Sequence, residues 1–377
     1  MEEVVVADAV DAGEVAVVKD KRYIPQRLLL QWHITGRCNL NCTHCYQDSE
    51  KCGELDFNKL TYILQQYKEL LTLWRKQSGQ HIGGHITVTG GEPFVRNDFI
   101  DLLNLFAINN KYFTFAILTN GTHIDKKMAT KLSQLNPRFV QVSVEGTEKT
   151  HDQIRGEGSY QRTISAIKHL VKAGVKTIIS FTAHRQNYNE FNDVAQLGRK
   201  LKVDRVWSDR LIPSGNGSDL KDFLLTPAET KSFFNIMKKA QRKSFFNLFN
   251  TTEISMHRAL QFLVSGGRPY HCTAGDSLIT VQPNGDLYPC RRMPISVGNL
   301  LETDLLELYY KSELFQKLRH KESVSSGCEE CQFSQVCRGG LKCLSHAITG
   351  NPFNADPGCW MNKDRMEKMA HIVDEIN

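Results

Sequence analysis

Three cysteines lie close together near the N-terminal end of the sequence. Cys38, Cys42 and Cys45 occur within eight residues, directly after an apolar run that is typical of a β-strand. Three thiolates at this spacing can bind three irons of a cubane iron-sulfur cluster and leave the fourth iron without a protein ligand. Such an open iron can chelate a small molecule and deliver an electron into it, whereas a fully ligated cluster only passes electrons on.

The three-then-two spacing of these cysteines, with Tyr46 following, resembles the radical S-adenosylmethionine (SAM) superfamily over residues 28–215. The resemblance implies that the three cysteines hold a 4Fe-4S cluster whose open iron binds SAM. The alternative is a zinc site or buried thiols without function, but zinc would need a fourth ligand. Cys52 matches no motif, and we interpret His33 and His44 as packing or pocket-lining residues.

A Gly-Gly-Glu-Pro turn at positions 90–93 strengthens the resemblance. In the family this turn holds the methionine ammonium of SAM, because glycine permits close backbone approach and a carboxylate pairs with the cation. Arg155 is expected to pair with the cofactor carboxylate. Many relatives have Asp where Glu145 stands, and Asn120 is a weaker candidate because strand-end asparagines often only close turns. The SAM contacts implied by the resemblance are Gly90, Gly91, Glu92, Pro93, Ser143, Glu145, Arg155 and Asn187.

Seven further cysteines follow in the C-terminal part of the chain. This part resembles the SPASM extension, a domain in which family members bind up to two auxiliary iron-sulfur clusters. Gly285 stands five residues before Cys290 in an Asn-Gly hairpin signal, as in that family. The cysteines are Cys272, Cys290, Cys328, Cys331, Cys337, Cys343 and Cys359.

One position departs from the SPASM pattern. The family commonly has a cysteine where this chain has Leu341, and Cys343 lies two residues further on. If Cys343 reaches the proximal cluster, that cluster has Cys272, Cys290 and Cys343 and keeps an open iron; if it does not, the cluster is smaller or absent. The distal cluster is expected to use Cys328, Cys331, Cys337 and Cys359. A pair of zinc sites is the alternative, and the radical SAM segment in front favours iron-sulfur.

Short apolar runs alternate with amphipathic helical stretches between residues 28 and 215. This alternation favours parallel strands joined by right-handed helical crossovers, so we predict an α/β fold with a partial (β/α)6 TIM-like barrel. The predicted strands are 28–35, 85–89, 113–119, 139–145, 176–183 and 205–212. The predicted helices between them are 58–75, 98–109, 126–135, 160–173 and 190–201.

The chain is predicted to divide into four segments. Residues 1–27 form an N-terminal extension and 28–215 the radical SAM partial barrel. A polar linker at 214–218 leads into a bridging helical segment at 216–268, where Thr226, Pro227 and Glu229 signal a helix start. Residues 269–377 form a small cysteine-rich domain held by metal more than by an apolar core.

Composition narrows the functional classes. The 377 residues carry a net charge of +6 spread along the chain, without an aromatic-interleaved basic motif, which argues against nucleic-acid binding. Apolar runs long enough to span a bilayer are absent from the sequence, and the acidic N-terminus is unlike a secretory signal. We therefore expect a cytoplasmic protein that makes no use of a membrane and keeps its 11 cysteines reduced.

The resemblance also implies a reaction. An electron from flavodoxin or ferredoxin cleaves SAM, and the 5'-deoxyadenosyl radical abstracts hydrogen from a substrate carbon. Relatives with a SPASM extension mostly modify ribosomally made peptides, by crosslinking, epimerisation or backbone change. The segment before residue 28 is short for a leader-binding domain, so a separate recognition protein or leader binding elsewhere is implied. Alternatives are tetrapyrrole side-chain modification, sulfatase maturation, or a non-enzymatic iron-sulfur carrier or scaffold. The sequence identifies no catalytic acid or base.

Overall fold

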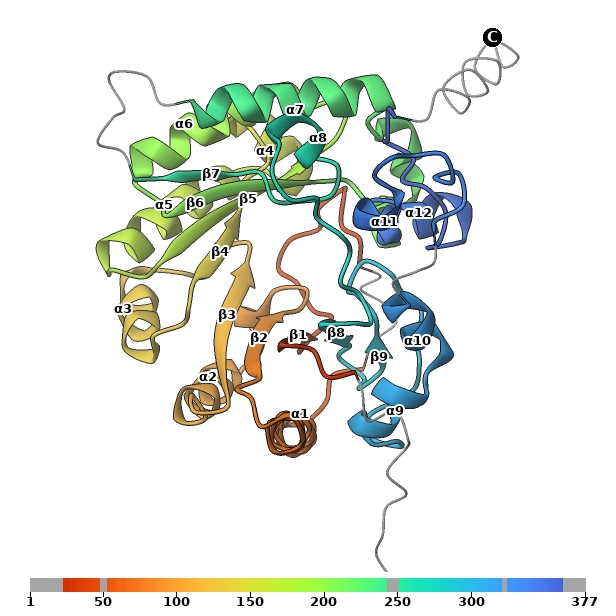
Figure 1. Ribbon diagram of the computed structural model, residues 1–377. Coiled ribbons are helices and arrows are strands. Elements are labelled where there is room, and N and C mark those ends of the chain that lie inside the picture. Colours follow the sequence, from red (N-terminus) through yellow and green to blue (C-terminus); the bar gives the residue numbers. More distant parts are fainter. Residues whose placement is uncertain (1–22, 48–52, 243–250, 321–323, 362–377) are drawn as a thin grey trace, which may run out of the picture.

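The computed structural model of the protein describes residues 23–47, 53–242, 251–320 and 324–361. Its centre is a curved, mostly parallel sheet with helices on its outer face (Figure 1). Cys52, much of the predicted N-terminal extension and the C-terminal end of the chain lie outside the described residues.

All six predicted strands are present in the sheet and lie in chain order, each parallel to the next. Their cores are apolar because both faces of a parallel sheet are covered, as the full burial of Leu28, Trp32 and Ile86 illustrates. The strands are β1 (Arg27–His33), β2 (Gly83–Thr89), β3 (Phe113–Thr119), β4 (Val140–Ser143), β5 (Thr177–Ala183) and β6 (Arg205–Arg210).

Further strands extend the sheet at both edges. Strand β7 (Glu253–Ser255) pairs in parallel with β6, and β8 (Leu278–Val281) pairs in parallel with β1. The predicted Asn-Gly hairpin follows β8: Gly285 has a φ of 93°, and β9 (Leu287–Tyr288) returns antiparallel to β8. Strand β8 lies within the predicted segment 269–377, so that segment contributes directly to the central sheet.

Five predicted helices cover the outer face of the sheet (Figure 1). Two begin at aspartate N-caps: Asp56 accepts a hydrogen bond from Lys59 N at 2.9 Å, and Asp125 accepts one from Met128 N at 2.7 Å. The helices are α1 (Phe57–Ser78), α2 (Phe99–Ile108), α3 (Lys126–Leu135), α5 (Ser159–Lys172) and α6 (Phe191–Leu201). Shorter turns between strands and helices are η1 (Pro93–Val95), α4 (Glu148–Arg155) and η2 (Tyr188–Glu190).

The bridging helix begins as predicted. After η3 (Gly215–Phe223), α7 (Pro227–Gln241) starts with a reciprocal capping box between Thr226 and Glu229. Its Phe233 and Phe234 are buried, and the Phe233 ring centre lies 6.3 Å from that of Phe181 on β5. The helices that follow α7 are short: α8 (Phe262–Ser265), α9 (Leu305–Lys311), α10 (Glu313–Arg319), α11 (Ser334–Cys337) and α12 (Lys342–Thr349). Within the described ranges, every helix is too short or too polar to cross a membrane.

Candidate iron-sulfur and cofactor site

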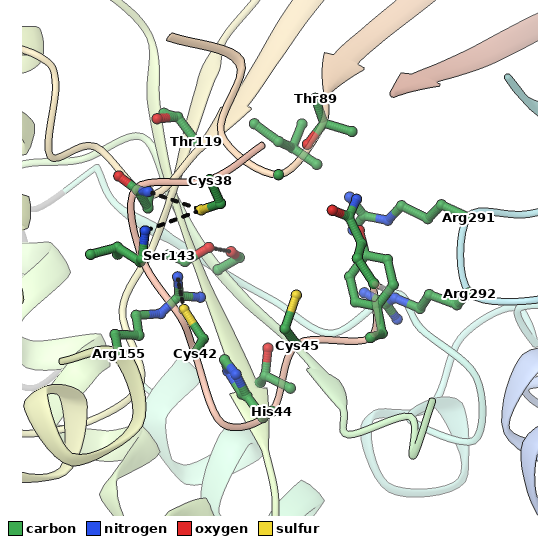
Figure 2. A pocket seen from close by; sticks show the side chains of 18 of the residues that line it. Cys38, Cys42, His44, Cys45, Thr89, Thr119, Ser143, Arg155, Arg291 and Arg292 are labelled. Atoms are coloured by element: carbon green, nitrogen blue, oxygen red, sulfur yellow. Dashed lines mark hydrogen bonds between the residues drawn. The ribbon is translucent and has the colours of Figure 1, made fainter. Parts of the chain in front are cut away.

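The loop after β1 carries the three N-terminal cysteines to the carboxyl ends of the parallel strands, the usual position of active sites in β/α barrels. Cys38, Cys42 and Cys45 line one cavity there (Figure 2). Two of the sulfurs accept hydrogen bonds from side chains: Asn120 Nδ2 lies 3.9 Å from Cys38 Sγ, and Arg155 Nη1 lies 3.8 Å from Cys42 Sγ. Donors aimed at sulfur stabilise thiolates that bind iron.

Backbone hydrogen bonds hold this cysteine loop in place. Thr43 N donates to Ile154 O at the end of α4 (3.0 Å), and Gly217 N donates to Cys45 O (2.9 Å). The loop also folds on itself through Cys45 N and Cys42 O at 3.2 Å. Segments remote in sequence therefore fix the loop from two sides.

The glycine pair after β2 packs against the start of the cysteine loop. Gly91 N donates to Thr35 O, and Glu92 N donates to Arg37 O, both at 2.8 Å. A Cβ atom on Gly91 would lie 2.3 Å from Arg37 O, and one on Gly90 would lie 2.6 Å from Thr35 O. Both glycines line the cavity. These two positions must therefore be glycine so that the loop and the turn can meet.

Glu92 and Pro93 lie behind the cavity and do not line it. The Glu92 carboxylate is fully buried and accepts hydrogen bonds from Asn120 N (2.7 Å), Thr119 Oγ1 (2.8 Å) and Phe94 N (3.3 Å). Burial nevertheless raises the pKa of Glu92 to about 7. In this arrangement Glu92 joins the turn to the end of β3, and its predicted contact with the SAM ammonium stays a prediction.

Glu145 forms the centre of a buried ionic cluster beside Cys42. Its Oε1 lies 2.5 Å from Arg155 Nη2 and 3.2 Å from His44 Nε2, and its Oε2 accepts from Thr182 N at 2.8 Å. Burial alone would raise the pKa of Glu145, but the charge of Arg155 outweighs it and holds the pKa well below its usual range. Arg155 therefore links Glu145 to a cysteine sulfur, and its predicted contact with the SAM carboxylate is not tested by these contacts.

The remaining predicted SAM contacts divide into two kinds. Ser143 lines the cavity, with its Oγ 3.4 Å from Ser180 Oγ. Asn187 is fully buried and does not line the cavity; its Nδ2 donates to Glu145 O (3.1 Å) and Thr182 O (3.0 Å). These bonds tie the ends of β4 and β5 together. Asn120, the weaker candidate, does line the cavity.

A second cavity lies beside the first and contains three of the C-terminal cysteines. Cys272, Cys290 and Cys343 all line it, so the displaced Cys343 lies with the two cysteines predicted to share its cluster. Cys343 is buried and belongs to the first turn of α12. Several side chains line both cavities and form a common wall: Leu118, Gln141, Trp207, Arg291 and Arg292.

The other four C-terminal cysteines gather at a third pocket. Cys328, Cys331, Cys337 and Cys359 line it together with Asp356. These four are the predicted distal set. The chain thus brings its ten described cysteines into one set of four and two sets of three.

Each of the three cysteine sets lines a cavity or pocket. Within the described part of the chain, no three His, Cys, Asp or Glu side chains converge closely enough to hold one metal ion. The cysteines instead lie around shared cavities, as expected when each thiolate binds a different iron. Burial raises the pKa of Cys38 and that of Cys328 to about 11, so iron must displace the proton from these thiols.

Four charged residues that line the first cavity were not identified from the sequence, and two of them, Arg291 and Arg292, also belong to the common wall. Asp209 and Arg210 end β6, whereas Arg291 and Arg292 follow Cys290 directly. Their positions after a strand end and after an expected cluster ligand were the available signals. Neither signal distinguishes a cavity residue from a surface one without the three-dimensional arrangement.

A parallel-stranded partial barrel with three cysteines at its carboxyl end and a cysteine-rich C-terminal region defines an iron-sulfur enzyme with auxiliary clusters. Comparison with family models agrees. Residues 32–198 match the model described as "Radical SAM superfamily", and residues 272–332 match SPASM, described as "Iron-sulfur cluster-binding domain".

Individual relatives extend the match over most of the chain. The mycofactocin maturase MftC of Mycolicibacterium smegmatis is 30% identical over 90% of this chain and 84% of its own length. An AdoMet-dependent heme synthase of Methanosarcina barkeri is 26% identical over 88% of this chain and 95% of its own. Among solved structures, anSMEcpe with bound AdoMet and Cp18Cys peptide has a TM-score of 0.69 at 18% identity, covering 93% of this chain and all of that one.

The chain belongs to the radical SAM superfamily and carries a SPASM domain. Its cofactors are SAM, a 4Fe-4S cluster and auxiliary iron-sulfur clusters. The cavity containing Cys38, Cys42 and Cys45 fits the first of these clusters, since it supplies three thiolates and two side-chain donors to sulfur.

Proposed function

We propose that this chain is a peptide maturase that oxidatively modifies a ribosomally made peptide. The observation that carries the proposal is the wall common to the two cysteine-lined cavities. A substrate held there would lie between the N-terminal cysteines and the proximal set Cys272, Cys290 and Cys343. The second cavity has a volume of about 380 Å³. That volume lies within the range of ligand sites, about 300–1,000 Å³.

The SAM site in this proposal consists of groups that line the first cavity. Gly90 and Gly91 offer backbone close to the cysteine loop, and Ser143 offers a hydroxyl. When bound, SAM and its cluster supply one-electron chemistry that removes hydrogen from an unactivated carbon. The chain's own part is to orient the substrate carbon and to exclude water, and the buried Gln141 and partly buried Trp207 of the common wall suit that part.

Two relationships support a peptide as the substrate. MftC is a named maturase at 30% identity, and anSMEcpe binds a peptide in a similar fold. A flavodoxin or ferredoxin would supply the electron. The leader of the peptide would bind either to a separate recognition protein or to another part of this chain.

The second candidate function is modification of a tetrapyrrole side chain. It is favoured by the heme synthase relative, which is 26% identical over 88% of this chain. Both candidate functions use the same SAM chemistry, so they differ only in which substrate binds against the common wall.

The test is coexpression of this chain with short peptides encoded beside its gene, followed by mass spectrometry of the peptides. A mass change that requires the chain and is lost in Cys42→Ala would support the maturase. The variant keeps too few thiolates to fix the open iron, so it should also form no 5'-deoxyadenosine. Cys52→Ala is the matched control. If only a supplied iron-porphyrin changes mass, the tetrapyrrole function replaces the maturase.

A further inference from the structure

Three arginines and one aspartate lie around the common wall. Asp209 Oδ2 is 2.7 Å from Arg258 Nη2 and 2.5 Å from Arg292 Nη1. Burial alone would raise the pKa of Asp209, but the two guanidinium groups outweigh it and hold the pKa well below its usual range. One carboxylate is therefore shared by two arginines, and the third arginine, Arg291, adds a further positive charge.

Arg291 stands at the tip of a turn that points into the cavity. Met293 N donates to Cys290 O at 3.0 Å, and this bond closes the turn with Arg291 and Arg292 at its centre. Figure 2 shows both arginines extending toward the cavity from the side opposite Arg155. The turn thus fixes Arg291 next to a predicted cluster ligand and on the wall common to both cavities.

The Arg291 guanidinium has an aromatic neighbour and no acidic one among the described residues. Its Cζ lies 5.5 Å from the centre of the Tyr46 ring. Every Asp or Glu of the described chain lies beyond ion-pair distance from it. A partly buried cation normally has an anionic partner, because the free-energy cost of removing its water must be offset by an opposite charge. The natural partner is therefore supplied by a ligand.

Arginine suits carboxylates and phosphates, and a peptide offers the carboxylate. Its planar guanidinium offers parallel N–H donors that match a carboxylate in a bidentate pair. The neighbouring guanidinium groups differ from it in this respect: Arg292 is paired with Asp209, and Arg155 is paired with Glu145. Arg291 is thus the cation of the common wall whose donors are available to a bound substrate.

We propose that Arg291 binds a carboxylate of the peptide substrate and so positions the peptide between the two cysteine sets. The inference rests on the proposed function and deepens it. The carboxylate belongs either to the C-terminus of the peptide or to an Asp or Glu side chain, and both present the same chemistry to the guanidinium.

The experiment uses reconstituted enzyme and synthetic copies of the peptide encoded beside the gene. Arg291→Gln should raise the peptide KM by about 30-fold or more with a smaller change in kcat, because an interaction with a buried charge is lost. Arg291→Lys should recover part of the loss. Arg185→Gln is the matched control, since Arg185 pairs with Glu229 at the surface.

Modified peptides identify the carboxylate. In one peptide the C-terminus is amidated, and in another each acidic side chain is replaced by its amide. The peptide that loses the partner of Arg291 should bind wild-type enzyme as weakly as the native peptide binds Arg291→Gln, with no further loss when the two changes are combined.

Several outcomes would overturn the inference. Equal peptide KM for wild type and Arg291→Gln would exclude the contact. If Arg291→Gln lost SAM affinity as strongly as peptide affinity, the guanidinium would be assigned to the cofactor. If the variant lost iron, the guanidinium would be assigned to the adjacent cluster. Absence of any peptide modification by the wild-type enzyme would instead remove the proposed function, so the two failures are distinct.

Discussion

Arg210 and Asp356 form a buried bidentate ion pair that joins the end of β6 to the C-terminal cysteine region. The Nη1–Oδ1 and Nη2–Oδ2 distances are 2.8 and 2.5 Å, and the two side chains are 4% and 1% exposed. Arg210 lines the first cavity, whereas Asp356 lines the pocket of the four distal cysteines. Asp356 also accepts hydrogen bonds from Leu341 N and Gly358 N, each at 2.9 Å. One carboxylate therefore fixes the distal pocket relative to the barrel.

Replacing Asp356 with Asn should destabilise the protein strongly. The change leaves the Arg210 charge buried without a counter-charge, which costs about 3–5 kcal/mol of the free energy of unfolding. Anaerobic chemical denaturation measures the effect. Glu253→Gln is the matched control because its pair with Arg205 is more than two-fifths exposed on both sides. The control should cost at most about 1 kcal/mol. Similar losses in the two variants would contradict the role of the buried pair.

Gly91→Ala should disturb the cysteine loop. The new Cβ would lie 2.3 Å from Arg37 O, a backbone atom that cannot move without shifting the loop. Overpacking of this kind costs about 1–3 kcal/mol, and we expect lower iron content and slower 5'-deoxyadenosine formation. Gly83→Ala is the control, because its Cβ would meet nothing closer than 3.6 Å. Full iron content in Gly91→Ala would show that the loop tolerates the shift.

The sequence predicted the barrel strands well because each is an apolar run bounded by polar turns. Strand β3 was placed at its observed limits, 113–119. The edge strands were missed for a physical reason: β7 has three residues, and β8 lies in a region where cysteines and glycines obscure the apolar pattern. Short strands of this kind are defined by the neighbour they pair with more than by their own residues.

The candidate site divides in the same way. Cysteine spacing and the resemblance to the SPASM extension together predicted three sets, with Cys343 conditional, and each set lines one cavity or pocket. The direction of buried side chains could not be predicted, since Glu92 and Asn187 turn away from the cavity toward backbone donors and acceptors. Arg291 was missed because its importance depends on the absence of a nearby carboxylate among the described residues, which is a property of the fold.

Cys343→Ala should affect the proximal auxiliary cluster alone. Cys343 lines the same cavity as Cys272 and Cys290, so its loss should lower iron content and change the paramagnetic resonance signal of that cluster. SAM cleavage by the N-terminal cluster should continue, while the yield of modified substrate falls more than SAM cleavage does. Cys331→Ala is the comparison, because it should strip the distal cluster and destabilise the surrounding region. Full iron and an unchanged spectrum in Cys343→Ala would make this cysteine a bystander.

Glu92 provides a pH-dependent test of the SAM contact. Burial raises its pKa to about 7, so its carboxyl group is mostly protonated at pH 6 and mostly ionised at pH 8. If the ionised form pairs with the SAM ammonium, SAM affinity should rise several-fold as pH increases from 6 to 8, with release of a proton on binding. Glu92→Gln should abolish this dependence and weaken binding at pH 8 by about 2–5 kcal/mol. Comparison with this variant also removes the titration of the ligand's own amino group.

A second variant separates the SAM contact from a purely structural role of Glu92. Thr119 Oγ1 donates to the Glu92 carboxylate at 2.8 Å and favours its ionised form. Thr119→Val should therefore raise the pKa of Glu92 and move the rise in SAM affinity to higher pH, with little change in affinity well above the new pKa. Isothermal titration calorimetry of the reconstituted enzyme in buffers of different ionisation enthalpy measures both affinity and proton release. A flat pH profile in wild type, with unchanged affinity in Glu92→Gln, would leave Glu92 as the residue that only joins the glycine turn to β3.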